Sequence, residues 1–454
     1  MLSGICKYII ESIKRKLKGE ELMVINYNRK TFPYRIFLAI VLIVEMHFFS
    51  LFTLPKGLEF IIYTNKSKWI GALSVVVGLV CYEKHKIILS RYIKFLKKYF
   101  ITVIVSIIFI SFYTTIKYPL NPLITTYGFA SYYLYSFLAI PILYIFSVED
   151  GYENLFGLFN SIAVIMYIIT IIQGIAYIKT GSLFFSASSD LNTGNMIRDG
   201  KVRFNSGALA FLMLIYNFYI LYNYRNKKNS KKLISIISII LGLLSIYFTG
   251  NSRIMVLTLL ASLGILILLG DGSSKKKLIA LIIIFAGIFI LFGSGIVAKF
   301  LDSFSSTGVL GGSSIARWGA CKYYWECFMK NPIFANGFAG DENYYDIVHG
   351  ASGIYYQTVY VRFFYDDVGI VGQLALLGVS VINIYIWPVF RIIKIAFKTC
   401  KNSNFLDGKF IMALVCYILC TTPTLIVIDS SRVIAFPIIL AVSEYIFVKY
   451  LDTK

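Results

Sequence analysis

The sequence predicts an all-α, polytopic integral membrane protein with about twelve transmembrane helices. Of its 454 residues, 58% are hydrophobic and only 15% are charged, and the mean hydropathy is +0.74. Soluble globular proteins carry about 25% charged residues, so this chain cannot cover a water-exposed surface of ordinary size. The composition therefore excludes a soluble enzyme, a disordered chain and a fibrous protein.

The predicted spans are apolar runs close to the length of about 20 residues that a helix needs to cross a bilayer. They cover residues 36–54, 69–83, 100–117, 128–147, 155–177, 207–223, 233–250, 254–270, 278–298, 368–390, 410–428 and 433–449. No internal repeat is found, so residues 36–454 are expected to form one transmembrane domain. Residues 1–35 are expected to be a basic cytoplasmic segment. Apolar residues recur at helical spacing beside lysines in its first part, which predicts an interfacial helix.

The distribution of Lys and Arg predicts the orientation of the spans. Most of these residues lie in segments that the span count puts on one side, namely residues 1–35, 84–98, 225–232, 275–277, 391–409 and 449–454. By the positive-inside rule this side is cytoplasmic, so both termini are expected in the cytoplasm. Retention of basic loops beside anionic lipid also accounts for the formal net charge of +21, so no nucleic-acid partner is expected.

Two long connections fall on the outer side, at residues 178–206 and at residues 299–367, between the ninth and tenth predicted spans. Long loops in compact proteins are usually functional, so the chemistry is expected on the outer face of the cell membrane. The second loop is predicted to hold a helix through Arg317 that ends at Asn331. One face of this helix would carry Trp318, Cys321, Trp325 and Phe328, which is typical of an amphipathic helix at headgroup level.

Arginines on the outer side are candidate binding residues, because the positive-inside rule disfavours them there. They are Arg198, Arg203, Arg253, Arg317, Arg362 and Arg432. The planar guanidinium group can bind a phosphate through two hydrogen bonds, so arginines at the membrane surface suit a lipid-linked phosphate or pyrophosphate. The alternative is that each of them pairs with a nearby acid or reaches to the lipid headgroups.

His349 is the histidine of the second outer loop, and imidazole can accept a proton near neutral pH. The alternative is an exposed loop histidine without a chemical role. The seven cysteines include no C-x-x-C pair, and the outer acids lack the spacing of a metal site. No phosphate-binding glycine motif follows a strand. Neither a metal nor another cofactor is therefore expected.

The motifs of the outer face resemble those of the O-antigen and capsular polysaccharide polymerase/ligase family. The matching stretches are residues 202–207, 249–254 and 316–337, together with His349-Gly350 ahead of Asp366-Asp367-Val368-Gly369. The resemblance covers roughly residues 180–390 and implies a GT-C-like membrane glycosyltransferase. It implies a polyprenyl-pyrophosphate-linked oligosaccharide as donor and a sugar hydroxyl of a second lipid-linked unit as acceptor.

This resemblance assigns expected roles to individual residues. Arg203, Arg253 and Arg317 would bind the donor pyrophosphate, and His349 would activate or orient the acceptor. Contacts to the glycan are expected from Asp366, Asp367, Tyr355 and Tyr356. The expected activity is polymerisation of repeat units without a metal, in contact with membrane lipids and beside a chain-length regulator or a flippase. Two alternatives stay open: a ligase that moves a finished glycan to another acceptor, and a flippase for lipid-linked oligosaccharides.

Overall fold

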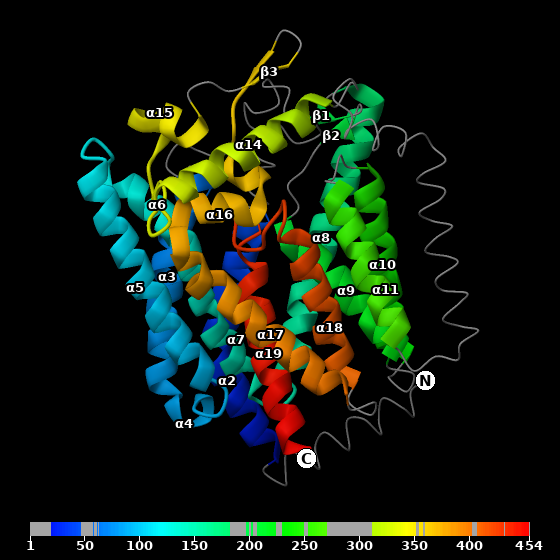
Figure 1. The fold of residues 1–454 in the computed structure, drawn as a ribbon. Coiled ribbons are helices and arrows are strands. Elements are labelled where there is room, and N and C mark those ends of the chain that lie inside the picture. The colour runs from blue at the N-terminus through cyan, green and yellow to red at the C-terminus, as the bar shows by residue number, and fades with distance from the viewer. Residues whose placement is uncertain are drawn as a thin grey trace.

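The computed structural model describes residues 20–46, 58, 61, 63–181, 197–198, 201–202, 207–223, 229–248, 253–269, 311–350, 354–356, 359–401, 406–430 and 432–453. These residues form a bundle of helices with two short antiparallel hairpins at one end (Figure 1). The predicted all-α class with apolar helices is confirmed.

The helices of the first part of the chain are α2 (Glu20–Glu45), α3 (Tyr63–Lys84), α4 (Lys86–Leu89), α5 (Lys94–Lys117), α6 (Leu123–Leu134), the 3₁₀ turn η3 (Tyr135–Leu138), α7 (Ala139–Phe146) and α8 (Gly151–Thr180). The middle part contains β1 (Ile197–Arg198), β2 (Lys201–Val202), α9 (Gly207–Asn223), α10 (Asn229–Phe248), α11 (Arg253–Leu269), α14 (Gly311–Lys330), α15 (Asp341–His349), β3 (Ile354–Tyr356) and β4 (Val359–Val361). The last part contains η6 (Tyr365–Asp367), α16 (Gly369–Leu377), η7 (Gly378–Ser380), the π-helical turn η8 (Ile382–Ile386), α17 (Trp387–Cys400), α18 (Leu406–Thr421) and α19 (Ala435–Asp452).

The two ends of the bundle differ in what they carry. Helices α14 and α15 and both hairpins lie at one end, here called the loop end (Figure 1). Helix α14 runs across this end, over α16, instead of along the bundle. Helix α4 and the last turn of α19 lie at the opposite end, here called the C-terminal end. The core between the ends includes α7, whose eight residues are all buried, and α19, which packs against α7, α17 and α18.

Several helices have the length and composition of membrane spans. Those long and apolar enough, among the described residues, are Lys94–Lys117, Leu123–Phe146, Gly151–Thr180 and Lys231–Phe248, and a bent pair covering residues 369–400 would make a fifth. Helix α5 also exposes apolar side chains along one face, namely Ile101, Val105, Ile108, Phe112 and Ile116. An exposed apolar stripe of this kind suits lipid, not water. The helices therefore indicate a membrane protein.

The first described helix differs from the first predicted span. Helix α2 runs continuously from Glu20 to Glu45, so the predicted boundary between residues 35 and 36 falls inside it. Hydropathy identifies only the apolar part of a helix, whereas backbone hydrogen bonds continue through polar residues. The predicted interfacial helix and the predicted span 278–298 lie outside the described residues.

The predicted span 368–390 is also not a single straight helix. Residues 369–380 and 382–400 are bent by 108° at a short break. Gly378 lies three residues before the break, where α16 ends. Its φ of +54° favours glycine, and a Cβ atom there would lie 2.2 Å from the carbonyl oxygen of Ile333. The neighbouring amide of Val379 donates a hydrogen bond to Pro332 O over 2.8 Å. The bend therefore packs against the chain between α14 and α15.

Two buried carboxylates inside the bundle each have a basic partner. Glu45 lies with its Oε2 3.5 Å from Lys66 Nζ, and both side chains are less than 5% exposed. Tyr135 donates a hydrogen bond to Glu45 Oε1 over 2.7 Å. Near the C-terminal end, Arg391 donates to both carboxylate oxygens of Glu444, over 2.8 and 3.1 Å. A buried charge without its partner typically costs 3–5 kcal/mol, so these pairs are required by the apolar surroundings.

Replacement of Gly378 tests the bend. We expect Gly378→Ala to destabilise the protein by about 1–3 kcal/mol, because the side chain forces both a strained φ and a backbone shift at Ile333. The measurement is the melting temperature in detergent. The matched control is Gly157→Ala in α8, where a Cβ atom meets nothing within 4 Å, and which should leave the melting temperature unchanged or raise it. Equal melting temperatures for the two variants would contradict the role of Gly378.

Candidate functional site

The segment between α14 and α15, residues 331–340, is here called the anchor turn. The Phe338 amide donates a hydrogen bond to Thr114 Oγ1 over 2.9 Å, at the end of α5. The Gly340 amide donates to Asn121 Oδ1 over 2.9 Å, and Asn121 Nδ2 donates in return to Phe338 O over 3.1 Å. Side chains at the end of α5 and in the connection that follows it thus satisfy these backbone groups. The start of α15 is therefore fixed against the bundle.

The anchor turn also contacts α16, next to the bend. At Gly337 it approaches α5 so closely that no side chain would fit. The Asn336 amide donates to Ala375 O of α16 over 2.9 Å. Gly337 has a φ of +61°, and a Cβ atom there would lie 2.5 Å from Thr114 Oγ1. Asn331-Pro332 and Gly337, which end the stretch 316–337 of the family resemblance, therefore belong to a packing element in this chain.

Helix α14 fixes the other end of α15. The predicted helix through Arg317 is confirmed, with bounds Gly311–Lys330. Tyr324 stacks on Tyr365 with ring centres 4.5 Å apart, and its hydroxyl group donates to Val348 O over 2.9 Å. Trp318 and Trp325 are exposed, with 77% and 47% of their surface accessible. One face of α14 therefore packs on the site, and another presents tryptophan to the surroundings.

His349 ends α15 and is held on both ring nitrogens. Its Nδ1 lies 2.6 Å from the carbonyl oxygen of Phe363, which can only accept, so Nδ1 carries a hydrogen. Its Nε2 lies 3.2 Å from Asp341 Oδ1. The His349 side chain is only 5% exposed, whereas the Asp341 side chain is 58% exposed. The carboxylate, not the imidazole, is therefore the member of this pair that faces outward.

The surroundings favour the protonated form of His349. Burial lowers the pKa of the imidazole, but hydrogen bonds to Asp341 and to the Phe363 carbonyl oxygen, with the negative charge of Asp341, raise it. The positive charge of Arg362 opposes them. The raising effects prevail, and the pKa of His349 lies above its usual value. Imidazolium can donate from both nitrogens, which matches the two acceptors in place.

Two of the arginines predicted to lie on the outer side are used for structure. Arg362 donates to Asp346 Oδ1 over 3.1 Å and to Gly350 O over 2.6 Å. Arg432 pairs with Asp429 in the turn between α18 and α19. The alternative to phosphate binding was that each arginine pairs with a nearby acid. Arg362 and Arg432 do so.

Arg317 is different. Its Nε atom is buried and has no hydrogen-bond partner in the part of the chain that the structure describes, although the residue is half-buried in α14. A buried guanidinium nitrogen without an acceptor is costly unless a ligand supplies one. Arg317 lies seven residues before Tyr324, which is about 10 Å along the helix axis. Among the described arginines of the loop end, Arg317 is therefore the one with a buried donor left for an anion.

The remaining predicted site residues divide into two groups. Asp366 lies in η6, and Ser430 Oγ donates to its Oδ2 over 3.1 Å. Asp367 is exposed beside it. The stretch from Phe363 to Asp367 therefore joins the His349 pair to the turn before α19. Other predicted residues have side chains outside the described part of the chain: Arg203, Arg253 (the first residue of α11), and Tyr355 and Tyr356 in β3.

Asp341 was not predicted as a partner of His349. Residues eight apart in a straight α-helix are separated by about 12 Å along its axis, so the spacing gives no signal for a contact. Helix α15 is kinked at Tyr344, where φ is −130° and ψ is 34°. The kink accompanies the 3.2 Å approach of the two side chains. Ser430 was also missed, because no periodicity relates it to Asp366.

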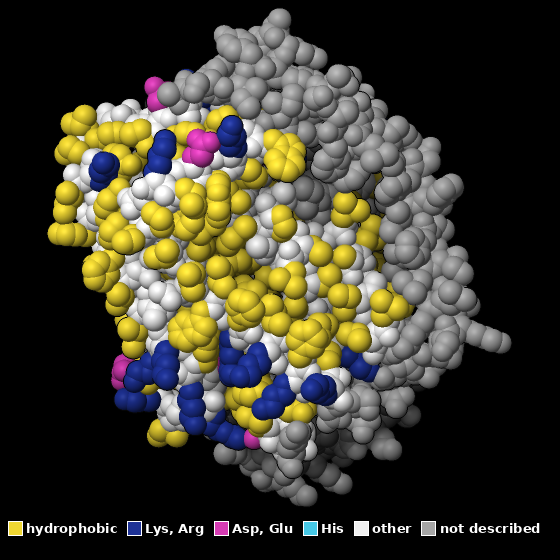
Figure 2. All heavy atoms as spheres, viewed as in Figure 1, with side chains coloured by type: hydrophobic (Ala, Val, Ile, Leu, Met, Phe, Trp, Pro, Cys, Tyr) yellow, Lys and Arg dark blue, Asp and Glu magenta, His cyan; other side chains and the backbone are white. Residues whose placement is uncertain are grey.

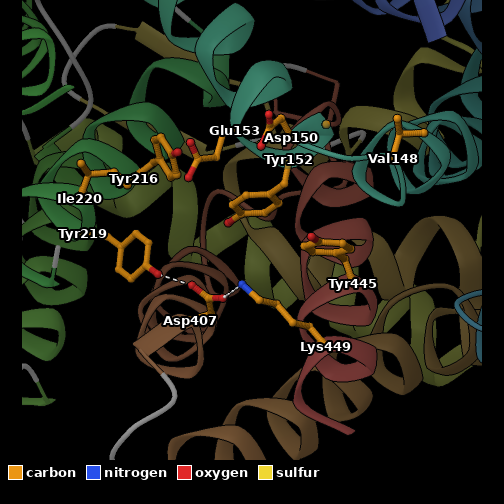
Figure 3. A pocket seen from close by; sticks show the side chains of 11 residues that line it. Val148, Asp150, Tyr152, Glu153, Tyr216, Tyr219, Ile220, Asp407, Tyr445 and Lys449 are labelled. Atoms are coloured by element: carbon orange, nitrogen blue, oxygen red, sulfur yellow. Dashed lines mark hydrogen bonds and ion pairs between the residues drawn. The ribbon is translucent and has the colours of Figure 1, made fainter. Parts of the chain in front are cut away.

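A cavity of about 170 Å³ lies at the C-terminal end, remote from these residues (Figure 3). Asp407 is its central group, and Figure 3 shows that it receives hydrogen bonds from Tyr219 and from Lys449, whose Nζ is 2.8 Å away. Both carboxylate oxygens are thus satisfied within the chain. In the described ranges no cluster of three or more His, Cys, Asp or Glu residues could hold a metal.

The raised pKa of His349 can be tested directly. The ion pair with Asp341 should be present below this pKa and should be lost as the pH rises through it. We expect His349 to titrate above the ordinary value of about 6.5 and Asp341→Asn to lower its pKa. The measurement is the imidazole shift of the three histidines by NMR, with His349→Gln for assignment. Titration of His349 at or below the ordinary value would contradict the ion pair.

No protein-family model matches the chain, and no curated protein matches it. The family resemblance of its motifs therefore stays a prediction.

Proposed function

We propose that the chain is a membrane glycosyltransferase that joins polyprenyl-pyrophosphate-linked oligosaccharide repeat units on the outer face of the cytoplasmic membrane. The observation that carries this proposal is the buried Nε of Arg317, which has no hydrogen-bond partner among the described residues. It lies on α14, whose Tyr324 donates a hydrogen bond to Val348 O, next to His349. A guanidinium group that needs an acceptor suits a pyrophosphate, and a carboxylate–imidazole pair suits a hydroxyl group.

The orientation in this proposal rests on charge. Basic side chains gather toward the C-terminal end, including Lys84, Lys94, Lys97, Lys398 and Lys449 in the terminal turns of their helices. Figure 2 shows Lys and Arg side chains gathered below a broad apolar band, with fewer of them above it, on the face in view. The positive-inside rule supports a cytoplasmic C-terminal end and an outward loop end. The proposal places both termini in the cytoplasm. It also includes twelve spans, so the predicted spans that are not among the described membrane-length helices would cross the membrane as well.

The chemistry needs little besides these groups. Pyrophosphate is a good leaving group, so positive charge on its oxygens and help to the incoming hydroxyl group are the main requirements. Arg317 would hold the pyrophosphate, together with Arg203 and Arg253. The His349–Asp341 pair would act on the acceptor, and Asp366, Asp367, Tyr355 and Tyr356 would contact the glycan. The exposed face of α14, with Trp318 and Trp325, would lie at headgroup level and guide the lipid carrier.

A transporter or flippase is the alternative of a different class. Transporters place ionisable residues near the middle of the membrane, and Glu45 and Glu444 are candidates. Each of them already has a basic partner, Lys66 and Arg391. The pairs satisfy these charges without a substrate, so we favour the glycosyltransferase. A ligase would use the same donor chemistry and differs only in its acceptor.

The test is polymer formation by the purified protein from purified lipid-linked repeat units. We expect wild-type protein to form polymer and Arg317→Lys to lower the rate about ten- to a hundredfold. Lysine keeps the charge but loses the two-pronged hydrogen bonding, which is worth about 1.5–3 kcal/mol for a charged group. The control is Arg91→Lys, at an exposed ion pair with Asp452 at the C-terminal end, which should retain the full rate.

Two results would contradict this proposal in different ways. Wild-type protein that forms no polymer, yet moves intact lipid-linked units across a vesicle membrane, would establish the transporter. Polymer formation at the wild-type rate by Arg317→Lys would remove Arg317 from the donor site.

A further inference from the structure

The hydrogen bonds of His349 decide which of its nitrogens could accept a proton. Nδ1 is committed to the carbonyl oxygen of Phe363, at 2.6 Å. The backbone strengthens this arrangement, because the Phe363 amide donates to His349 O over 3.2 Å. Phe364 and Tyr345 also pack on the imidazole, with ring centres 4.8 and 4.5 Å away. The ring is therefore held in one orientation, and Nε2 is the only nitrogen that could act as a base.

Asp341 occupies the position that a substrate hydroxyl group would need at Nε2. Its Oδ1 lies 3.2 Å from Nε2, and the imidazole itself is almost completely buried. An incoming hydroxyl group therefore meets the carboxylate first. No hydrogen bond to Asp341 Oδ2 is present within the described ranges, and the side chain is 58% exposed. This oxygen can accept a proton from outside without any rearrangement of the pair.

We propose that Asp341 accepts the proton of the sugar hydroxyl group that attacks the donor. His349 is then a positioning residue that holds Asp341 through Nε2–H. This inference rests on the proposed function. In the transfer step, the hydroxyl O–H bond breaks and its proton moves to Asp341 Oδ2. The hydroxyl oxygen forms a bond to the anomeric carbon of the donor. The bond from that carbon to the pyrophosphate oxygen breaks, and its electron pair leaves with the lipid pyrophosphate.

The geometry around the pair supports this division of roles. Asp341 is the first residue of α15, directly after Gly340, whose amide is bound by Asn121. His349 is the last residue, beside Val348, whose carbonyl oxygen is bound by Tyr324. Arg362 contacts Asp346 and Gly350 at the same helix, so a fixed positive charge lies near without occupying Asp341. Both ends of the pair are thus held by the bundle, while the carboxylate stays accessible.

Substitutions that separate a carboxylate base from an imidazole base provide the test, in polymer formation from purified lipid-linked repeat units. We expect Asp341→Asn to lower turnover about 10²–10⁴-fold, as for loss of a general base. His349→Gln should stay within about tenfold of wild type, because its amide can still donate to Asp341. The control is Glu342→Gln, the adjacent exposed carboxylate, which should keep wild-type turnover.

Chemical rescue distinguishes a missing base from a damaged fold. Asp341→Ala should be inactive and should regain turnover when formate is added, because the exposed position leaves room for a small carboxylate. His349→Ala should not respond to formate. Rescue of a variant also shows that it is folded, so an inactive Asp341→Asn protein remains interpretable.

The outcomes separate this inference from the proposed function. If wild-type protein forms no polymer, the proposed function itself is wrong. If wild-type protein is active and Asp341→Asn is equally active, only the role of Asp341 is overturned. The inference is also overturned if His349→Gln is as inactive as Asp341→Asn and formate does not rescue Asp341→Ala. Those two results together would assign the base to the imidazole.

Discussion

Thr114 and Asn121 each accept a hydrogen bond from the backbone of the anchor turn, and α15 begins directly after the second of these bonds. The positions of Asp341 and His349 depend on this contact, because the two residues are the first and last of α15. The same turn bonds to Ala375 and to the amide of Val379, at the bend that separates α16 from α17. The loop end is therefore assembled on the ends of α5 and α6, and not on the long loop itself.

The division between an apolar bundle and a polar loop end determines where chemistry can occur. The buried carboxylates Glu45 and Glu444 within the bundle are paired with Lys66 and Arg391, because a lone buried charge is costly. Among the described residues of the loop end, the Nε of Arg317 and the exposed carboxylate of Asp341 both keep capacity for a ligand. One is a cation that suits an anionic leaving group, and the other is an anion that suits a hydroxyl proton. A cation for the leaving group and a carboxylate for the hydroxyl proton are together the physical basis of the proposed transfer reaction.

Composition and apolar runs predicted the helical class, and helical spacing with an Asn-Pro stop predicted α14 to within a few residues. Hydropathy could not predict the bend at Gly378, because its cause is a backbone contact with Ile333 that no local pattern encodes. It also placed the start of α2 too late, since polar turns continue a helix. His349 was found from residue type and loop position. Asp341 was not, because only a kink at Tyr344 accounts for a contact between residues eight positions apart.

The claim on which everything else rests is that the loop end faces the outside of the cell. It is tested by labelling single cysteines with a membrane-impermeant reagent in intact cells, in a background without native cysteines. The exposed residues Glu342 at the loop end and Lys401 at the C-terminal end are suitable positions. We predict labelling of Glu342→Cys in intact cells and labelling of Lys401→Cys only after the membrane is opened. Labelling of Lys401→Cys in intact cells, with Glu342→Cys protected, would contradict the account.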